Sequence, residues 1–215
     1  MGARNVLIRP YRESDREAVG DICVRTADAG GDSRHIYPDL ELMPTIFAWP
    51  YTDLEPSLAF VADNGERAVG YVVGTADTPS FVSRIESEWL PKVSDRYPPV
   101  SEPSTPTENM VWLLHNPRRM IVPALADYPA HLHIDLLPEY QRSGHGRALM
   151  TAFLGALAYQ NVPAVHLGML SVNTAARAFY HRLGFHQIDV PNAEPLTYLG
   201  LEVGPNAWLK GTSAG

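Results

Sequence analysis

The chain has 215 residues, with 17 basic and 24 acidic side chains, a formal net charge of −7 and a pI near 5.6. A chain of this length forms one domain or one domain with a large insertion, and the acidic balance argues against a nucleic-acid binder. No apolar run approaches the roughly 18 residues of a membrane span, and the first residues lack the apolar segment of a signal peptide. The single cysteine, Cys23, permits neither an intramolecular disulfide nor a zinc–cysteine cluster. We therefore expect a globular, cytoplasmic protein.

The first half of the chain combines strand and helix patterns. These predict a strand at 6–11, a helix at 13–28, and strands at 57–63 and 68–77 that are joined by a hairpin turn at 64–67. Residues 29–51 contain glycines and prolines and predict loop with one short helix. Residues 78–129 are rich in proline, with short helix patterns at 81–90 and 109–115. Because this segment cannot form its own core, we interpret 1–215 as a single domain with an insertion at about 78–129.

The second half carries stronger patterns. It predicts a strand at 131–137, a polar turn at 138–146, an amphipathic helix at 147–160, a strand at 164–170, a helix from 173 to 184, and strands at 186–190 and 196–203. Asn173 is a good N-cap for the second of these helices, and Gly184 is a good C-cap. The order of elements predicts an α/β (α+β) domain around one central sheet.

The turn between the strand at 131–137 and the following helix is suited to phosphate binding. Gly144 and Gly146 let the backbone approach a ligand closely, and the helix N-terminus presents amides and a positive dipole end. A P-loop is excluded because Arg147 and Ala148, rather than Lys and Ser or Thr, follow Gly146. The dinucleotide fingerprint is excluded because Leu149 stands where its third glycine belongs. The turn is either a pyrophosphate cradle or a simple structural turn.

This segment resembles the acyl-CoA-binding motif of the GCN5-related N-acetyltransferase (GNAT) superfamily, Gln/Arg-x-x-Gly-x-Gly/Ala, filled by Gln141, Gly144 and Gly146. Asn173 to Phe185 resembles the family's second segment, Asn-x-x-A-x-x-x-Y-x-x-x-G-F. The resemblance implies the GNAT fold, in which a mixed, mostly antiparallel splayed sheet flanked by helices holds acetyl-CoA between the strands at 131–137 and 164–170. More loosely, the tract HIDLLPEY resembles bacterial relatives of the acetyltransferase-like C-terminal domain of eukaryotic O-GlcNAcase.

The resemblance also implies roles for individual residues. Tyr180 matches the general acid that protonates the departing CoA thiolate, although it could simply be a buried aromatic residue. Asn173 matches a position that contacts the cofactor arm, or it only caps its helix. Leu136 and Leu137 would pair through their backbones with the pantetheine arm and polarise the thioester carbonyl. The remaining cofactor-binding residues form the loop: Gln141, Arg142, Ser143, Gly144, His145, Gly146 and Arg147.

The candidates for the general base are neighbouring residues on one predicted strand. Strand alternation places His131, His133 and Asp135 on the same face. Asp135 lies nearest the loop and is the first candidate, and His133 is the second; alternatively, Asp135 only orients a neighbour. The same triple matches part of the zinc signature of metallo-β-lactamase-like hydrolases, but Leu136 replaces the final histidine. We therefore expect no metal.

The predicted function is direct transfer of an acetyl group from acetyl-CoA to a primary amine of an unidentified acceptor. An inactive acetyltransferase-like binding module is the alternative, and a metal-dependent hydrolase is a remote one. The expected partners are acetyl-CoA and the amine acceptor, without nucleic acid or membrane, and a homodimer is left open. Trp49, Tyr51, Trp89 and Trp112 could line an acceptor pocket or belong to the local core. The pair Arg118–Arg119 is interpreted as solvated charge rather than a contact to the CoA 3′-phosphate.

Overall fold

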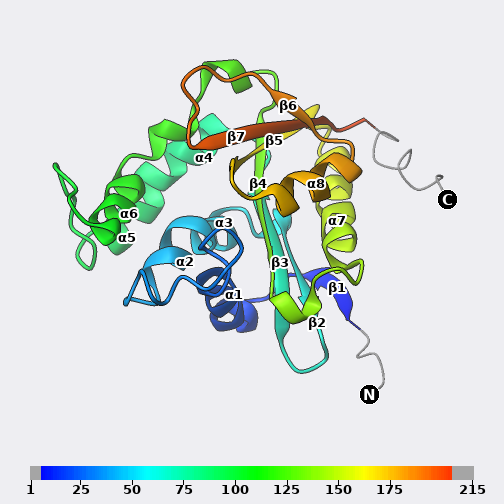
Figure 1. The fold of residues 1–215 in the computed structure, drawn as a ribbon, viewed down its shortest axis with the longest axis horizontal. Coiled ribbons are helices and arrows are strands. Elements are labelled where there is room, and N and C mark those ends of the chain that lie inside the picture. The colour runs from blue at the N-terminus through cyan, green and yellow to red at the C-terminus, as the bar shows by residue number, and fades with distance from the viewer. Residues whose placement is uncertain (1–5, 205–215) are drawn as a thin grey trace.

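The computed structural model describes residues 6–204, which contain one seven-stranded sheet with the strand order β1-β2-β3-β4-β5-β7-β6 (Figure 1). The strands are β1 (Leu7–Pro10), β2 (Ala59–Asp63), β3 (Ala68–Thr75), β4 (Ala130–Leu136), β5 (Ala164–Leu170), β6 (His186–Ile188) and β7 (Leu196–Glu202). Neighbouring strands are antiparallel except for β4 and β5, which are parallel. The predicted mixed, mostly antiparallel sheet is therefore confirmed.

The sheet splays between its two central strands. β4 and β5 pair only at Ala130–Val165 and His131–His166, and beyond these residues the two strands separate. On its other edge β4 stays paired with β3 along its length, from His131 opposite Thr75 to Leu136 opposite Gly70. The C-terminal halves of β4 and β5 therefore face one another without hydrogen bonds, as the predicted cofactor position requires.

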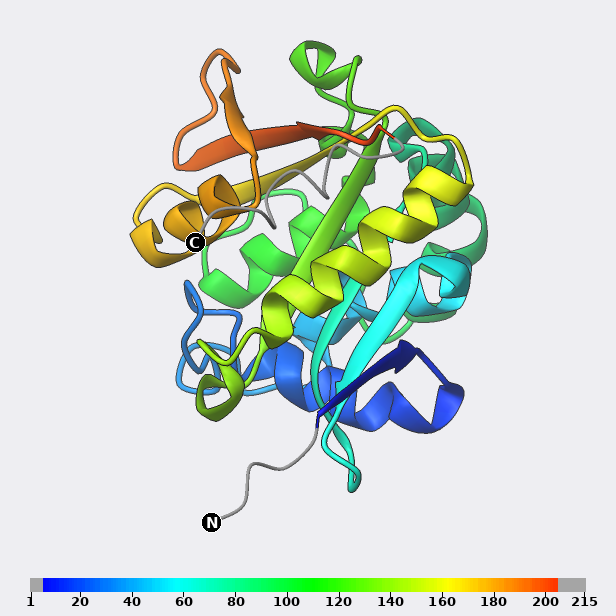
Figure 2. The same cartoon turned by 90° about the vertical axis from the view of Figure 1, so that its right-hand side faces the viewer.

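Helices cover both faces of the sheet. α7 (His145–Tyr159) crosses one face, where its Phe153 ring lies so close to Gly74 of β3 that a Cβ atom there would be 2.6 Å from it (Figure 2). The other face carries α1 (Arg16–Val24), α2 (Leu42–Phe47) and α3 (Trp49–Leu54). Since successive residues of a strand face opposite sides, Leu132 of β4 faces α7, whereas His131, His133 and Asp135 face α1–α3. α8 (Thr174–Arg182) lies beside the start of α7, where Phe179 contacts Gly146.

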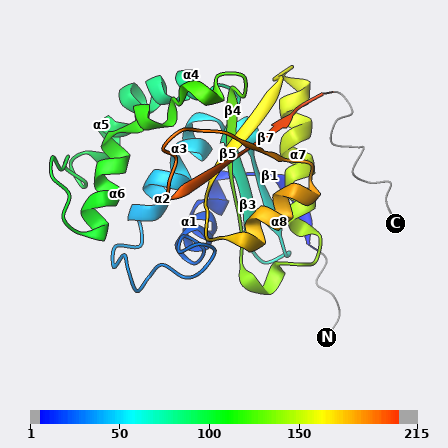
Figure 3. The same cartoon turned by 45° about the horizontal axis from the view of Figure 1, so that its top comes forward.

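Residues 78–129 form helices on the α2 side of the molecule (Figure 3). They comprise α4 (Thr78–Arg84), a π-helical turn (Ile85–Trp89), α5 (Leu90–Val93), α6 (Pro106–His115), and 3-10 turns at Pro117–Met120 and Pro123–Leu125. Phe81, Trp89 and Leu114 of this segment are buried in the same core as the sheet. Further 3-10 turns lie at Glu13–Asp15, Pro56–Leu58 and Pro138–Tyr140. In the part of the chain that the structure describes, no helix is long and apolar enough to cross a membrane.

Local differences from the predictions have physical causes. Residues 29–51 contain two short helices instead of one, because Ala48, at φ −132° and ψ −59°, interrupts the run between α2 and α3. The helix predicted at 81–90 begins three residues earlier, where the Asp77 side chain accepts a hydrogen bond from the Ser80 amide at 2.7 Å. β6 ends at Ile188, two residues before the predicted end.

Candidate active site

The loop between β4 and α7 forms a cradle of backbone amides. Arg142 and Gly144 adopt left-handed conformations, with φ of 60° and 87°, and α7 begins directly afterwards at His145. The Gln141 side-chain amide donates to the Leu136 carbonyl oxygen at 3.0 Å, which ties the loop to the end of β4. Residues 141–144 are exposed, so the amides of the first turn of α7 are accessible. Left-handed residues before a helix N-terminus create an anion-binding concavity, so this loop fits a pyrophosphate.

The two glycines of the loop serve different purposes. A Cβ atom at Gly144 would meet nothing within 4 Å, so the space beside it is open to a ligand. A Cβ atom at Gly146 would lie 3.2 Å from the Phe179 ring of α8, so this glycine allows α8 to pack against α7. Of the two glycines, Gly144 is therefore the one that leaves open space beside the loop.

At the end of β4, the backbone groups of Leu136 and Leu137 point in different directions. The Leu137 amide donates to the Val69 carbonyl oxygen at 3.0 Å, so this residue is bound to β3. In an antiparallel ladder the hydrogen-bonding direction alternates from residue to residue, so the peptide groups of Leu136 turn toward β5 and the splay. The Leu136 amide can therefore meet a ligand between the strands, whereas the Leu136 carbonyl oxygen already accepts from Gln141 and the Leu137 amide is bound to Val69.

Asp135 is half-buried in a polar cluster on the face of β4 that is covered by α1. The Tyr71 hydroxyl, opposite it on β3, donates to the carboxylate at 2.6 Å. Burial raises the pKa of Asp135, and hydrogen bonds from Tyr71 and Thr26 oppose this rise only in part. The carboxylate is consequently a stronger base than one in water.

Cys23, distant from Asp135 in the sequence, belongs to the same cluster. Its side chain is buried beside Tyr71, and burial together with the charge of Asp135 raises the pKa of the thiol. A thiol held in its protonated form is a poor nucleophile, which disfavours an acyl-cysteine intermediate.

Tyr180 extends from α8 toward the same region. Its ring lies between Phe179 and Phe185, it is 8% exposed, and its hydroxyl has no hydrogen-bond partner among the described residues. Burial raises its pKa, and the negative charge of Asp135 raises it further. The predicted acid and base thus lie close enough to influence one another, and Tyr180 keeps its proton at neutral pH.

Asn173 caps α8, as predicted. Its side-chain oxygen accepts from the Ala176 amide at 3.0 Å, and its side-chain nitrogen donates to the Ala29 carbonyl oxygen at 3.0 Å. The residue therefore joins the start of α8 to the loop after α1 in addition to capping its helix.

His131 and His133 are linked by Tyr51 of α3. The Tyr51 hydroxyl lies 2.8 Å from His131 Nε2 and 3.1 Å from His133 Nε2. Because the Thr78 hydroxyl donates to the Pro129 carbonyl oxygen, it accepts from His131 Nδ1 at 2.8 Å. His131 Nε2 therefore carries no proton and accepts from the Tyr51 hydroxyl. Tyr51 in turn accepts from His133 Nε2, which carries the proton of that ring. His133 Nδ1 is then the unprotonated nitrogen and can accept a proton. Burial and the charge of Arg119 lower the pKa of His133 to about 4, so it is a weaker base than its type implies.

A cavity of about 190 Å³ lies where β4 and β5 begin to separate, on the α2–α3 side of the sheet. We call it the histidine pocket: it is lined by Ile46, Phe47, Pro50, Tyr51, Ile85, Trp89, Leu113, Leu114, Pro117, Arg119, Met120, His131, Leu132, His133, His166, Leu167, Gly168, Leu196 and Tyr198. Of the four aromatic residues considered from the sequence, Tyr51 and Trp89 line this pocket, whereas Trp49 and Trp112 are absent from its wall.

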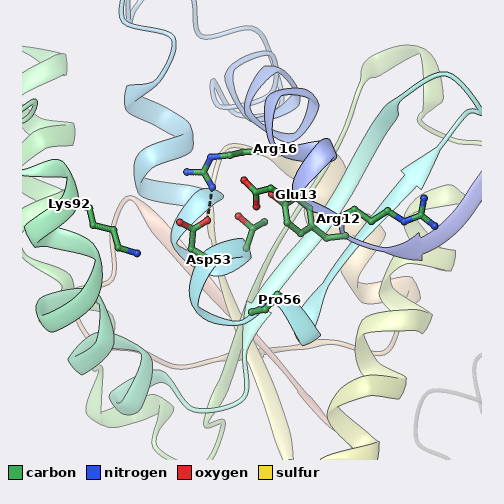
Figure 4. Close-up of a pocket in the computed structure, with 8 residues that line it drawn as sticks. Arg12, Glu13, Arg16, Asp53, Pro56 and Lys92 are labelled. Carbon is green, nitrogen blue, oxygen red and sulfur yellow. Dashed lines mark hydrogen bonds and ion pairs between the residues drawn. The ribbon is translucent and has the colours of Figure 1, made fainter.

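A second hollow opens at the start of α1 and contains mixed charges (Figure 4). Arg16 pairs with Asp53 across it, and Glu13, Arg12 and Lys92 also line it. No predicted site residue lines this hollow.

The zinc-like triple does not form a metal site in the described part of the chain. No group of three or more His, Cys, Asp or Glu side chains between residues 6 and 204 is arranged to hold a metal ion. Asp135 bonds to Tyr71, whereas His131 and His133 bond to Tyr51. The three side chains therefore have separate partners although they share a strand face.

Comparisons with known proteins agree with this geometry. A family model described as an acetyltransferase (GNAT) domain matches residues 115–187. The crystal structure of SsHAT is 59% identical, covers 93% of this chain and 98% of its own, and has a TM-score of 0.89. Protein O-GlcNAcase of Mus musculus is 22% identical over 185 residues, which are 84% of this chain but 20% of that protein. The structure of yncA from Salmonella typhimurium, with its cofactor acetyl-CoA, is 17% identical with a TM-score of 0.54 and covers 94% and 96% of the two chains.

The fold and site define an acyltransferase that uses acetyl-CoA as its acyl donor. The chain belongs to the GNAT superfamily, and the looser resemblance to relatives of O-GlcNAcase is also confirmed. Because the chain spans only 20% of the length of the O-GlcNAcase proteins it matches, their activity as whole proteins is not transferred to it.

Replacing Gly144 with valine should abolish most acetyl-CoA binding, since it places a β-branched side chain where the pyrophosphate belongs. Isothermal titration with acetyl-CoA measures the effect. Gly65→Val is the matched control: Gly65 has a φ of 89°, a Cβ atom there also meets nothing within 4 Å, and it lies in the β2–β3 turn. Both variants should lose stability to similar backbone strain, of the order of 1–2 kcal/mol. If both variants lose acetyl-CoA binding equally, the loop after β4 is not the pyrophosphate site.

Proposed function

We propose that this protein transfers the acetyl group of acetyl-CoA directly to a primary amine, with Asp135 as general base and Tyr180 as general acid. The observation that carries the proposal is their convergence. A carboxylate of raised pKa and a tyrosine hydroxyl that has no hydrogen-bond partner within residues 6–204 come from distant parts of the chain and meet beside the splay that leads from the amide cradle. Paired groups with complementary protonation states are what amine acylation requires.

The chain's residues have separate tasks in this reaction. The amides of Arg142, Ser143, Gly144, His145, Gly146 and Arg147, with Gln141 bracing the loop, hold the pyrophosphate. The Leu136 amide, which points toward the splay, contacts the pantetheine arm and polarises the thioester carbonyl. Asn173 keeps α8, and with it Tyr180, in place at the splay. These tasks position the thioester between Asp135 and Tyr180.

The bonds and protons balance without a covalent enzyme intermediate. Asp135 accepts one proton from the acceptor's ammonium group, and the freed nitrogen lone pair forms the new C–N bond to the thioester carbon. The C–S bond breaks with its electron pair on sulfur, and Tyr180 donates its hydroxyl proton to that sulfur. The second nitrogen proton returns through water to Tyr180, and the proton on Asp135 is released. The products are an N-acetylated acceptor, CoA thiol and one proton.

A panel of amines tests the proposal, with acetyl-CoA as donor and released CoA thiol as the readout. We expect amine-dependent thiol release and an N-acetyl product by mass spectrometry, both unaffected by a metal chelator. Binding of acetyl-CoA without acetylation of any amine would contradict the proposal and favour the binding-module alternative. Activity that a chelator abolishes would instead favour a hydrolase.

A further inference from the structure

The histidine pocket has the size and polarity of a site for one small molecule. Its walls are mostly apolar, with Ile46, Phe47, Trp89 and Leu114 facing residues of β4, β5 and β7. An apolar cavity of about 150 Å³ is large enough for benzene, so about 190 Å³ admits one ring or branched chain with a short polar end. A folded polypeptide segment does not fit inside such a volume.

Arg119 is the one charged side chain among the residues that line this pocket. It makes no ion pair or side-chain hydrogen bond with any described residue, whereas the adjacent Arg118 pairs with Glu86 at 2.7 Å. The groups close to its guanidinium are Tyr51, Tyr198, His131 and His133. Both side chains are exposed, as the interpretation of the pair as solvated charge expects, but Arg119 also lines the pocket and Arg118 does not.

Among residues 6–204, no carboxylate pairs with Arg119. The side chain is open to solvent at the pocket, yet the crowded protein around it lowers the pKa of the guanidinium. His131 and His133 are neutral at physiological pH because burial and the nearby arginine lower their pKa values, so neither competes with an incoming anion. An anionic ligand that enters the pocket would supply the opposite charge that no described residue gives to this guanidinium. The planar guanidinium matches a carboxylate in a bidentate arrangement.

We propose that Arg119 binds a carboxylate of the acceptor, so that the substrate class is a small amine carrying both a carboxylate and an apolar group. This inference rests on the proposed acetyl transfer, since it places the acceptor in the histidine pocket. His133, beside Arg119, and Asp135, the base, lie two residues apart on one strand face, a separation of about 6.6 Å. One small molecule can therefore place its carboxylate at Arg119, its apolar group against Trp89 and Leu114, and its amine near Asp135.

The experiment compares acceptors matched in their apolar group, at saturating acetyl-CoA. Phenylalanine and leucine are the acids, and phenethylamine and 3-methylbutylamine are their counterparts without the carboxylate. We expect wild type to favour the acids in kcat/KM. Arg119→Met should reduce kcat/KM for the acids by roughly 10- to 100-fold and leave that for the amines unchanged, since a hydrogen-bonded ion contact is lost. Arg119→Lys should restore part of the loss, and Arg118→Met should have no effect.

A binding measurement separates failure of this inference from failure of the acetyl transfer. N-acetylphenylalanine and N-acetylphenethylamine are titrated into the CoA-bound full chain, which requires no turnover. Selective binding of the acid that disappears in Arg119→Met supports the carboxylate site even if no amine is acetylated. Absence of selectivity, or equal turnover of acids and amines by wild type, overturns it.

A separate arm tests whether Arg119 instead meets the cofactor. If Arg119→Met weakens binding of CoA but not of 3′-dephospho-CoA, Arg119 binds the cofactor's 3′-phosphate and the acceptor assignment is wrong. Equal binding of both by wild type and variant supports the proposal. Thermal melting of Arg119→Met should match wild type, since the guanidinium makes no ion pair or hydrogen bond with any described residue that the variant would lose.

Discussion

Replacing Tyr180 with phenylalanine is expected to lower kcat roughly 10²–10⁴-fold while leaving acetyl-CoA affinity nearly unchanged. The hydroxyl is needed only when the C–S bond breaks and the thiolate requires a proton, so its removal affects the transition state rather than the bound ground state. Burial and the neighbouring Asp135 raise the pKa of Tyr180, so wild type holds the proton throughout the neutral range. Single-turnover kinetics with a defined amine measures this step directly.

The same substitution should leave the fold intact. The Tyr180 hydroxyl has no hydrogen-bond partner among the described residues, and the ring contacts with Phe179 and Phe185 are retained in phenylalanine. Tyr128→Phe is a matched control, because its hydroxyl lies 2.8 Å from His186 Nε2, outside the site. If Tyr180→Phe turns over like Tyr128→Phe while chemistry limits the rate, another group protonates the thiolate.

The elements that carry the cofactor loop could be predicted closely from the sequence because their signals are local. The strand at 164–170 was predicted with the residues that β5 has, and the helix after the loop differs by two residues at its start and one at its end. Both depend on apolar periodicity and on turn residues nearby in the chain. Asn173 capping α8 is equally local, since an N-cap side chain bonds to an amide three residues later.

The residues that surround the predicted base, Asp135, could not be predicted from local sequence patterns. Tyr71 meets Asp135 only because the β3–β4 register places them opposite one another, and no local pattern determines that register. Cys23 reaches the same cluster through the packing of α1 on the sheet, although it lies far from the motif in sequence. Tyr51 joins His131 to His133 because two short helices, rather than one, form in a proline-rich segment.

The position of Arg119 in the histidine pocket could not be predicted from local sequence patterns either. In the sequence it is half of an arginine pair, and charge pairs of this kind are usually solvated. Its position in the pocket is determined by the 3-10 turn at Pro117–Met120 and by the long helical segment that returns to β4. The proposed acceptor site therefore lies in the part of the chain with the weakest sequence signals, whereas the proposed cofactor loop lies in the part with the strongest.

Asp135→Asn is expected to lower kcat/KM for the amine by roughly 10²–10⁴-fold and to leave acetyl-CoA binding in place. An amide cannot accept the ammonium proton, but its oxygen can still accept the Tyr71 hydroxyl. Removing a charge whose burial raises its own pKa should not lower the melting temperature at neutral pH, so the variant remains interpretable. Loss of acetyl-CoA binding together with stability would mean that Asp135 has a structural role.

The pH dependence of the rate identifies the titrating group. Asp135 must be ionised to accept a proton, so wild-type kcat/KM should fall as pH decreases through its pKa, which burial raises from its ordinary value. Tyr71→Phe removes a hydrogen bond that lowers this pKa, so the acid limb should move to higher pH while the plateau rate is largely kept. His133→Gln should leave the limb in place, because His133, with a pKa of about 4, is not the base in this mechanism. If the acid limb moves in His133→Gln and stays unchanged in Tyr71→Phe, His133 is the general base instead of Asp135. His133 is the next candidate along the strand because its Nδ1 can accept a proton while its Nε2 bonds to Tyr51.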